Sequence, residues 1–215
     1  AHPYLIKAEK KGDTIFGNLH YYNDSITEFW MIEDQGYELA DSKTLTKLKD
    51  GVQSINFNFK DTTGKFVSLN DAQFKDKVVV VQILGTWCPN CLDETQFFLS
   101  YLNENPNEDL AFIGLSVEAA KTEERALKRI SSMIEKFDIP YPILLAQYGS
   151  TDKEIFLEKI PMLENIISYP TTIIIDKSGK VNSIHTGFNG PATGQAYIDY
   201  KNEFESEIKG LLELQ

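Results

Sequence analysis

Two cysteines separated by two residues carry the clearest chemical signal in this sequence. Cys88 and Cys91 are the only cysteines in a chain of 215 residues. A disulfide framework spreads its cysteines along the chain, whereas a lone Cys-x-x-Cys pair beside a strand and a helix is typical of a redox dithiol. The pair is therefore predicted to alternate between dithiol and disulfide. A structural zinc site is the weaker alternative, because it takes four ligands and the chain adds only three scattered histidines.

The pair lies where a buried strand is followed by a helix. The run VVVVQIL at residues 78–84 is typical of a strand covered on both faces, and apolar residues recur at helical spacing from Cys91 onward. Free amides and the helix dipole at a helix N-terminus stabilise negative charge, and the thiolate is the species that attacks a disulfide. We therefore predict that Cys88 is the nucleophile and that Cys91 resolves the mixed disulfide. Pro89 suits a first helical turn, and Trp87 is expected to pack as a partly exposed ring beside the pair.

The elements that must position this pair alternate between strands and helices, which predicts an α/β sandwich. A strand–helix–strand start implies parallel strands joined by right-handed crossovers. A closing hairpin and a last helix complete a mixed sheet with helices on both faces. The expected strands cover residues 78–84, 111–117, 142–146, 172–175 and 181–185, and the expected helices cover residues 91–102, 122–137, 152–160 and 195–214.

Residues 1–50 are predicted to form an N-terminal β-hairpin extension, and residues 51–215 the main domain. Strand-forming residues at 15–22 and 26–32 flank an Asn-Asp turn. An Asn-x-Ser sequence at residues 23–25 matches the N-glycosylation pattern, but such matches are common by chance. A receptor-like function of residues 1–50, with incidental cysteines, is a third hypothesis. The extension also holds a group of aromatic residues that we interpret as packing rather than as a carbohydrate or partner site, namely Tyr21, Tyr22, Phe29, Trp30 and Tyr37.

Composition and charge exclude several classes of protein. The chain is 42% hydrophobic and 25% charged, which is ordinary for a globular protein, and no apolar run is long enough to cross a membrane. The formal net charge is −11, so nucleic acid is not expected as a partner, because an acidic chain repels a phosphate backbone. The first residues lack the basic-then-apolar pattern of a signal peptide.

The segment GTWCPNCLDE at residues 85–94 resembles the active-site segment of the TlpA/ResA-like thiol–disulfide oxidoreductases of the thioredoxin superfamily. Before it, INFNFKDTTGKFVSLNDAQFKDKVVVV is similar to the N-terminal hairpin and central strand of that branch. Downstream, SYPTTIIIDKSGKV resembles its proline loop, and IHTGFNGPATG resembles a glycine-rich segment before the last helix. The resemblance covers about residues 50–214. It implies a thioredoxin-like three-layer sandwich with a mixed central sheet, to which this chain adds the N-terminal β extension.

The resemblance gives a role to Pro170 and its neighbours. Only about 5–6% of X-Pro bonds are cis, but the proline at this position of thioredoxin-like proteins is cis and faces the cysteine pair. The resemblance therefore implies a cis Pro170, with backbone groups of Tyr169 and Thr171 exposed for edge pairing with a substrate chain. Trp87 and Pro89 complete the expected substrate-binding surface.

The resemblance also points to Glu94 as a catalytic residue beside the two cysteines. Taken alone, a glutamate in the first turns of a helix is typical of a solvated surface. ResA-like proteins carry a glutamate at this position, where it is linked to thiol protonation. Thioredoxin has a buried aspartate six residues before its first cysteine, and here that position is Gln82, which cannot transfer a proton. Glu94 or Glu118 is therefore a candidate for that role, although Glu118 is expected to be an exposed acid at a strand end.

His185 is the residue on which a different function would depend. A lone histidine in a strand is usually structural. Together with Cys88 and Cys91 it could bind copper, as in the Sco-like proteins of this superfamily, which usually have three residues between their cysteines rather than two.

The leading hypothesis is a thiol–disulfide oxidoreductase that reduces or exchanges protein disulfides. Such an enzyme needs no organic cofactor, but an external reductant protein must restore its dithiol. The resemblance further implies an extracytoplasmic location in the bacterial periplasm or cell envelope. A lipid or N-terminal helix that tethers the protein to the membrane would then precede this chain.

Overall fold

A computed structural model of the chain describes residues 5–21, 24–34, 36 and 40–214, and it contains two compact units. The first unit is Ala1–Ala40 and the second is Asp41–Gln215. No helix in the described part of the chain is long and apolar enough to cross a membrane. The cysteine pair lies in the second unit.

The first unit contains a three-stranded antiparallel sheet in the order β1-β2-β3, formed by Leu5–Lys11, Thr14–His20 and Ile26–Ile32. The sequence predicted only the hairpin of the second and third strands, because the alternating charges of LIKAEKK obscured the first. Of the aromatic residues expected to pack, Phe29 is half-buried. Trp30 is 66% exposed and is not buried in a core. Tyr22, Tyr37 and the Asn23 position of the glycosylation pattern lie outside the described residues.

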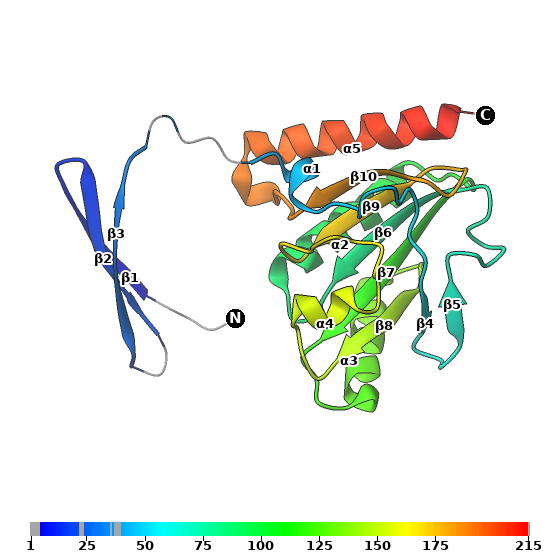
Figure 1. The fold of residues 1–215 in the computed structure, drawn as a ribbon, viewed down its shortest axis with the longest axis horizontal. Helices are drawn as coiled ribbons and strands as arrows, with labels where there is room; N and C mark the ends of the chain where they lie inside the picture. The colour runs from blue at the N-terminus through cyan, green and yellow to red at the C-terminus, as the bar shows by residue number, and fades with distance from the viewer. Residues whose placement is uncertain (1–4, 22–23, 35, 37–39, 215) are drawn as a thin grey trace. The chain divides into compact units, whose positions relative to one another are not determined.

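The second unit is built on a seven-stranded mixed sheet in the order β10-β9-β6-β7-β8-β4-β5 (Figure 1). Strands β6, β7 and β8 are parallel to one another. On one side β9 pairs antiparallel with β6, and β10 pairs antiparallel with β9. On the other side β4 pairs antiparallel with β8, and β5 pairs antiparallel with β4. The strands are β4 Asn58–Lys60, β5 Phe66–Ser68, β6 Val78–Leu84, β7 Leu110–Glu118, β8 Ile143–Tyr148, β9 Thr171–Ile175 and β10 Val181–Thr186. The helices are α1 Ser42–Leu45, α2 Pro89–Glu104, α3 Glu123–Phe137, α4 Lys153–Leu157, a short 3-10 turn Pro191–Thr193 and α5 Gln195–Glu213.

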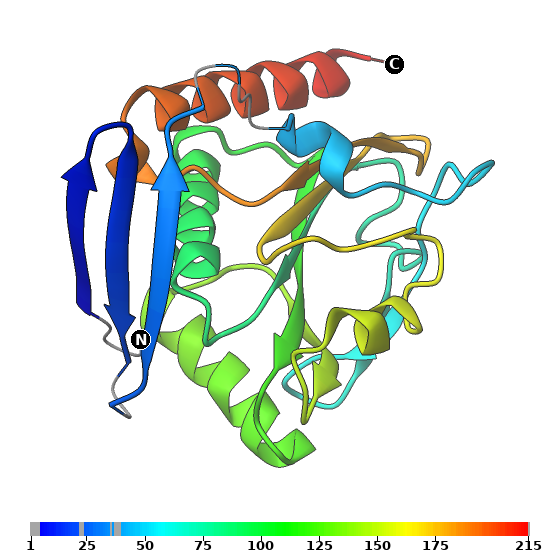
Figure 2. The same cartoon turned by 60° about the vertical axis from the view of Figure 1, so that its left-hand side comes forward.

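The central strand β6 serves two hydrophobic cores, one on each face of the sheet. Val78, Val80 and Leu84 belong to the core under α2, α3 and α5. Val79, Val81 and Ile83 alternate with them and belong to the core on the face of α4 (Figure 1 and Figure 2). A strand with apolar partners on both faces needs a continuous β-branched run, which is why the sequence around residue 80 shows no alternation.

Residues 41–50 belong to the second unit, although the sequence placed the domain boundary after residue 50. The buried hydroxyl of Thr186 in β10 donates to the Thr46 hydroxyl at 2.8 Å. Leu48 forms a β-bridge with Leu163. These partners lie more than a hundred residues further along the chain, so the short polar segment showed no local sign of its attachment.

We expect a chain that begins at Asp41 to keep the stability of the second unit and a chain that begins at Gly51 to lose part of it. The shorter chain loses the hydrogen bond between Thr186 and Thr46, which costs about 0.5–1.5 kcal/mol, and the packing of Leu48 against the core. Urea denaturation followed by circular dichroism measures the two midpoints. Equal midpoints would show that residues 41–50 add nothing to the second unit.

Candidate active site

Cys88 and Cys91 lie at the N-terminus of α2 and form a disulfide, with their Cα atoms 5.3 Å apart. Cys88 is the N-cap residue, and its Sγ accepts a hydrogen bond of 3.3 Å from the backbone N–H of Cys91. The helix therefore begins at Pro89, slightly before the predicted start. Cys88 is 7% exposed and Cys91 is fully buried. Cys88 is thus the sulfur that an incoming molecule can reach, and a helix-end amide is already directed at it.

The proline loop faces Cys88. The Tyr169–Pro170 peptide bond is cis, and Pro170 is buried. The carbonyl oxygen of Tyr169 lies 3.7 Å from Cys88 Sγ, where it can accept a hydrogen bond from the thiol once the disulfide is reduced. Gly187, which follows β10, also holds this loop, because its N–H donates to the carbonyl of Pro170 at 2.8 Å.

Thr171 does not lie at an open edge, contrary to the expectation that its backbone is exposed. It is fully buried at the start of β9, in register with Ile83 of β6 on one side and Thr186 of β10 on the other. Its hydroxyl donates to the carbonyl of Ser168 at 2.8 Å. Because neighbouring strands flank it on both sides, Thr171 can order the proline loop but cannot pair with another chain.

Trp87 is held beside the pair as a half-exposed ring. Its indole Nε1 donates to the Val117 carbonyl at 2.8 Å, and its ring packs edge-on against Tyr169 with centroids 5.9 Å apart. Gly85 makes this position possible, because a Cβ atom there would clash with the indole and lie 2.9 Å from the Val117 oxygen. Sequence reasoning singled out Trp87 but not Gly85, whose only sequence signal is its place between a strand and the motif.

The two residues between the cysteines, Pro89 and Asn90, have different environments. Pro89 is exposed, as a substrate-binding position requires. The Asn90 side-chain amide donates to the Phe188 carbonyl at 3.1 Å. The structure therefore brings the glycine-rich segment around Phe188 to the active-site helix, a contact that the sequence did not reveal.

Glu118 is fully buried, so the expectation of an exposed strand-end acid was wrong. It accepts hydrogen bonds from the backbone N–H and the hydroxyl of Thr86 at 2.9 and 2.8 Å, and from the Ser116 hydroxyl at 2.7 Å. A buried carboxylate requires such donors. Glu118 therefore holds the loop that leads into Cys88. It is the last residue of β7 and is buried there.

Glu94 is also fully buried, one helical turn beyond Cys91. Its carboxylate accepts hydrogen bonds from Gln82 Nε2 at 2.9 Å and from the Tyr200 hydroxyl of α5 at 3.1 Å. Burial raises the pKa of the Glu94 carboxyl from its usual 4.5 to about 7, while these hydrogen bonds act in the opposite direction. Glu94 is therefore a carboxyl that can gain or lose a proton near neutral pH, rather than the solvated helix acid that its position alone would indicate.

Gln82 connects Glu94 to the cysteine pair. Its side-chain amide donates both to Glu94 and to the Cys91 carbonyl, the latter at 3.1 Å. The Thr95 hydroxyl lies 2.9 Å from the Gln82 oxygen and 2.9 Å from the Cys91 carbonyl. Glutamine cannot transfer a proton itself, but it fixes the carboxylate close to the first turn of α2.

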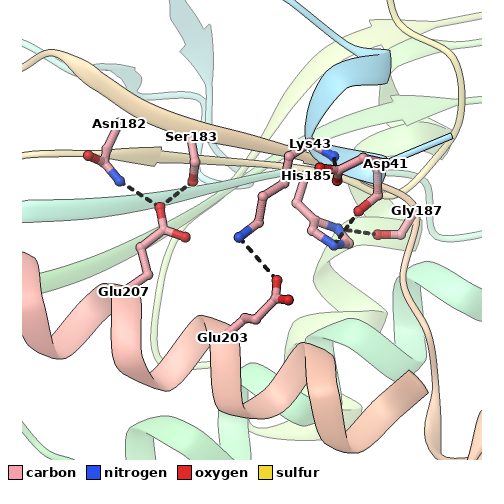
Figure 3. A network of polar contacts seen from close by, with 9 residues as sticks. Asp41, Lys43, Asn182, Ser183, His185, Gly187, Glu203 and Glu207 are labelled. Carbon is pink, nitrogen blue, oxygen red and sulfur yellow. Dashed lines mark hydrogen bonds and ion pairs between the residues drawn. The ribbon is translucent and has the colours of Figure 1, made fainter. Parts of the chain in front are cut away.

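His185 lies in a separate polar network at β10, α1 and α5 (Figure 3). Its Nδ1 donates to the Gly187 carbonyl at 3.1 Å, so Nε2 accepts from the Ser42 hydroxyl at 2.8 Å. Its ring packs edge-on against Tyr200, and burial lowers its pKa. Among the described residues no group of three or more His, Cys, Asp or Glu side chains is placed to hold a metal ion, and the copper hypothesis is not favoured.

Three comparisons relate this geometry to known proteins. Residues 47–197 match the Redoxin family model. Thioredoxin-like protein YneN of Bacillus subtilis is 30% identical over 146 residues, which cover 68% of this chain and 76% of that protein. Thiol-disulfide oxidoreductase ResA of Bacillus thuringiensis is 28% identical over 148 residues, which cover 68% of this chain and 73% of that protein.

Solved structures support the same fold. A crystal structure from Chlorobium tepidum, described as a thiol:disulfide interchange protein DsbE, superposes with a TM-score of 0.56 at 18% identity. The match covers 77% of this chain and 99% of that one. The sheet is mixed and thioredoxin-like, and the Cys-x-x-Cys pair lies at the start of a helix. Together with relatives that are thiol-disulfide oxidoreductases, these features define the chain as a thiol–disulfide oxidoreductase. The chain belongs to the Redoxin family.

The buried Glu94 makes the stability of the oxidised protein dependent on pH. Because the folded protein holds this proton more tightly than the unfolded chain, stability falls as pH rises from about 4.5 to about 7 and is constant above that range. At about 1.4 kcal/mol for each pKa unit, the loss is about 3 kcal/mol. Urea denaturation at pH 5 and pH 8 should show that Glu94→Gln removes most of this decrease, and an unchanged decrease in the variant would contradict the assignment.

Proposed function

We propose that the Cys88–Cys91 dithiol reduces or exchanges disulfides in protein substrates, with Cys88 as the nucleophile. The observation that carries the proposal is the position of Cys88 Sγ, which accepts the Cys91 N–H at the helix N-terminus and faces the Tyr169 carbonyl. A helix-end amide directed at a sulfur favours the thiolate over the thiol. Cys88 is also the more exposed sulfur of the pair.

The proposed cycle moves two electrons from the protein to the substrate. The Cys88 thiolate attacks one sulfur of the substrate disulfide, forms a mixed disulfide and releases the other substrate sulfur as a thiolate. Cys91 then loses its proton and attacks Cys88 Sγ, which releases the second substrate thiolate and leaves the Cys88–Cys91 disulfide. An external reductant protein restores the dithiol. No organic cofactor takes part.

The substrate chain is proposed to bind across the proline loop and the ring beside it. Trp87 and Pro89 are exposed next to Cys88, and Tyr169 with Pro170 presents backbone toward the sulfur. Thr171 contributes by ordering this loop through its bond to Ser168, not by touching the substrate.

Glu94 is proposed to accept the proton that Cys91 releases. Support comes from its place one helical turn beyond Cys91, its connection to the Cys91 backbone through Gln82, and its pKa of about 7. A base with a pKa near the working pH is the most effective proton acceptor. Glu118 is not proposed for this role, because its hydrogen bonds tie it to the preceding loop.

An extracytoplasmic site of action, in the bacterial periplasm or cell envelope and with a membrane tether outside this chain, is proposed from the resemblance to the TlpA/ResA-like branch. Fractionation of the source cells with an antibody against this chain tests the location.

Replacing the resolving cysteine should trap the intermediate. We expect Cys91→Ser, mixed with a disulfide-bonded protein such as insulin, to accumulate a covalent mixed disulfide through Cys88, because no second sulfur can release it. Mass spectrometry after acid quenching detects the adduct, and Cys88→Ser should form little of it. Equal trapping by both variants would contradict the assigned roles.

Replacing Glu94 should slow the resolving step only where its carboxylate is normally ionised. We expect Glu94→Gln to lower the rate of release from the mixed disulfide by about 10²-fold at pH 8 and much less at pH 5.5. Stopped-flow measurement of Trp87 fluorescence follows this step, and Glu104→Gln, an exposed acid of the same helix, is the matched control. A loss that is equal at both pH values would show that Glu94 acts only through structure.

A further inference from the structure

A groove of about 650 Å³ lies directly beside the active-site loop. One wall is the segment that leads into Cys88 together with Leu92 of α2, and the other wall is α3. The groove is therefore continuous with the surface around Cys88. Its lining is formed by Gly85, Thr86, Trp87, Leu92, Arg125, Lys128, Arg129, Ser132, Met133, Lys136 and Phe137.

The α3 wall combines an apolar base with a row of positive charge. The lining residues of α3 recur at spacings of three and four, so they share one face of the helix. Met133 is buried and Phe137 half-buried at its base, and both pack in the core under α2 and α3. The exposed residues of the same face are Arg125, Lys128, Arg129, Ser132 and Lys136.

This concentration of positive charge contrasts with the rest of the chain. The formal net charge is −11, and the chain contains only two arginines, Arg125 and Arg129, both of which line the groove. None of the four groove cations forms an ion pair with another described residue, whereas lysines elsewhere pair with acids, such as Lys43 with Glu203. Cations left without partners on an acidic protein are available for a carboxylate from another molecule.

We propose that this groove binds an acidic segment of the substrate polypeptide next to its reactive cysteine. Guanidinium groups bind carboxylates through two parallel hydrogen bonds, which suits recognition of Asp and Glu side chains. The base of the groove, formed by Leu92, Met133 and Phe137, accepts apolar side chains of the bound segment that alternate with its Asp and Glu residues. A bound segment would extend past Trp87 to Cys88, which makes a polypeptide rather than a small anion the fitting occupant.

The charge pattern also gives the groove a selective effect. The net negative charge of the chain disfavours the approach of an acidic substrate, and the α3 face offsets this effect beside Cys88. Basic segments lack this attraction at the groove. The proposal rests on the proposed disulfide chemistry, to which it adds a preference for one class of substrate.

Peptide substrates test this preference directly. Three peptides of equal length would each carry one cysteine in a mixed disulfide with a chromophoric thiol and differ in having acidic, neutral or basic neighbours. We expect wild-type protein to reduce the acidic peptide with a kcat/KM about tenfold above that of the basic one at low salt. Arg125→Glu/Arg129→Glu should abolish or reverse this order while the neutral peptide changes less than about twofold. Lys209→Glu/Lys201→Glu, on α5, is the charge-matched control and should keep the order.

Binding without chemistry separates this proposal from the function on which it rests. Fluorescence anisotropy with the acidic peptide, its cysteine replaced by serine, should show salt-sensitive binding that the double arginine variant loses. If wild type reduces all three peptides at the same rate and binds none preferentially, the groove proposal is wrong and the proposed function stands. If no peptide is reduced, the proposed function fails, and the anisotropy result alone decides whether the groove binds acidic segments.

Discussion

The short connection from β6 to α2 is held in place by buried polar side chains, and the geometry of the cysteine pair depends on it. Glu118 accepts hydrogen bonds from Thr86 on the outgoing loop. Gln82, still inside β6, donates to the Cys91 carbonyl on the helix. Because both ends of the connection are bonded to the sheet, Cys88 is fixed as the N-cap of α2 with a backbone amide directed at its sulfur. This arrangement keeps the sulfur of Cys88 at a defined place.

The same buried groups separate the structural part of the site from the proposed proton acceptor. Glu118 accepts hydrogen bonds from Thr86 of the loop that it holds and from Ser116 of its own strand. Glu94 is fully buried between Gln82 and Tyr200, and burial moves its pKa to about 7. The different roles proposed for these two buried glutamates therefore follow from their neighbours, not from their own chemistry.

The proposed substrate contacts lie outside this buried layer. Trp87, Pro89 and the Tyr169 carbonyl surround the more exposed sulfur, and the cationic face of α3 continues this surface away from it. Cys91, Thr171 and Glu94 are fully buried behind it. In the proposed function, the buried layer carries the chemistry and the exposed residues select the substrate.

The sequence by itself determined the redox pair, the order of strands and helices from residue 78 onward, and the mixed α/β sheet, because these depend on short spacings and on periodicities along the chain. It did not reveal that Glu118 is buried, that Thr171 has strands on both sides, or that residues 41–50 attach to Thr186 and Leu163. Those features depend on contacts between residues far apart in the sequence. Only the tertiary structure decided which carboxyl groups leave water, and with it where a proton can be held near neutral pH.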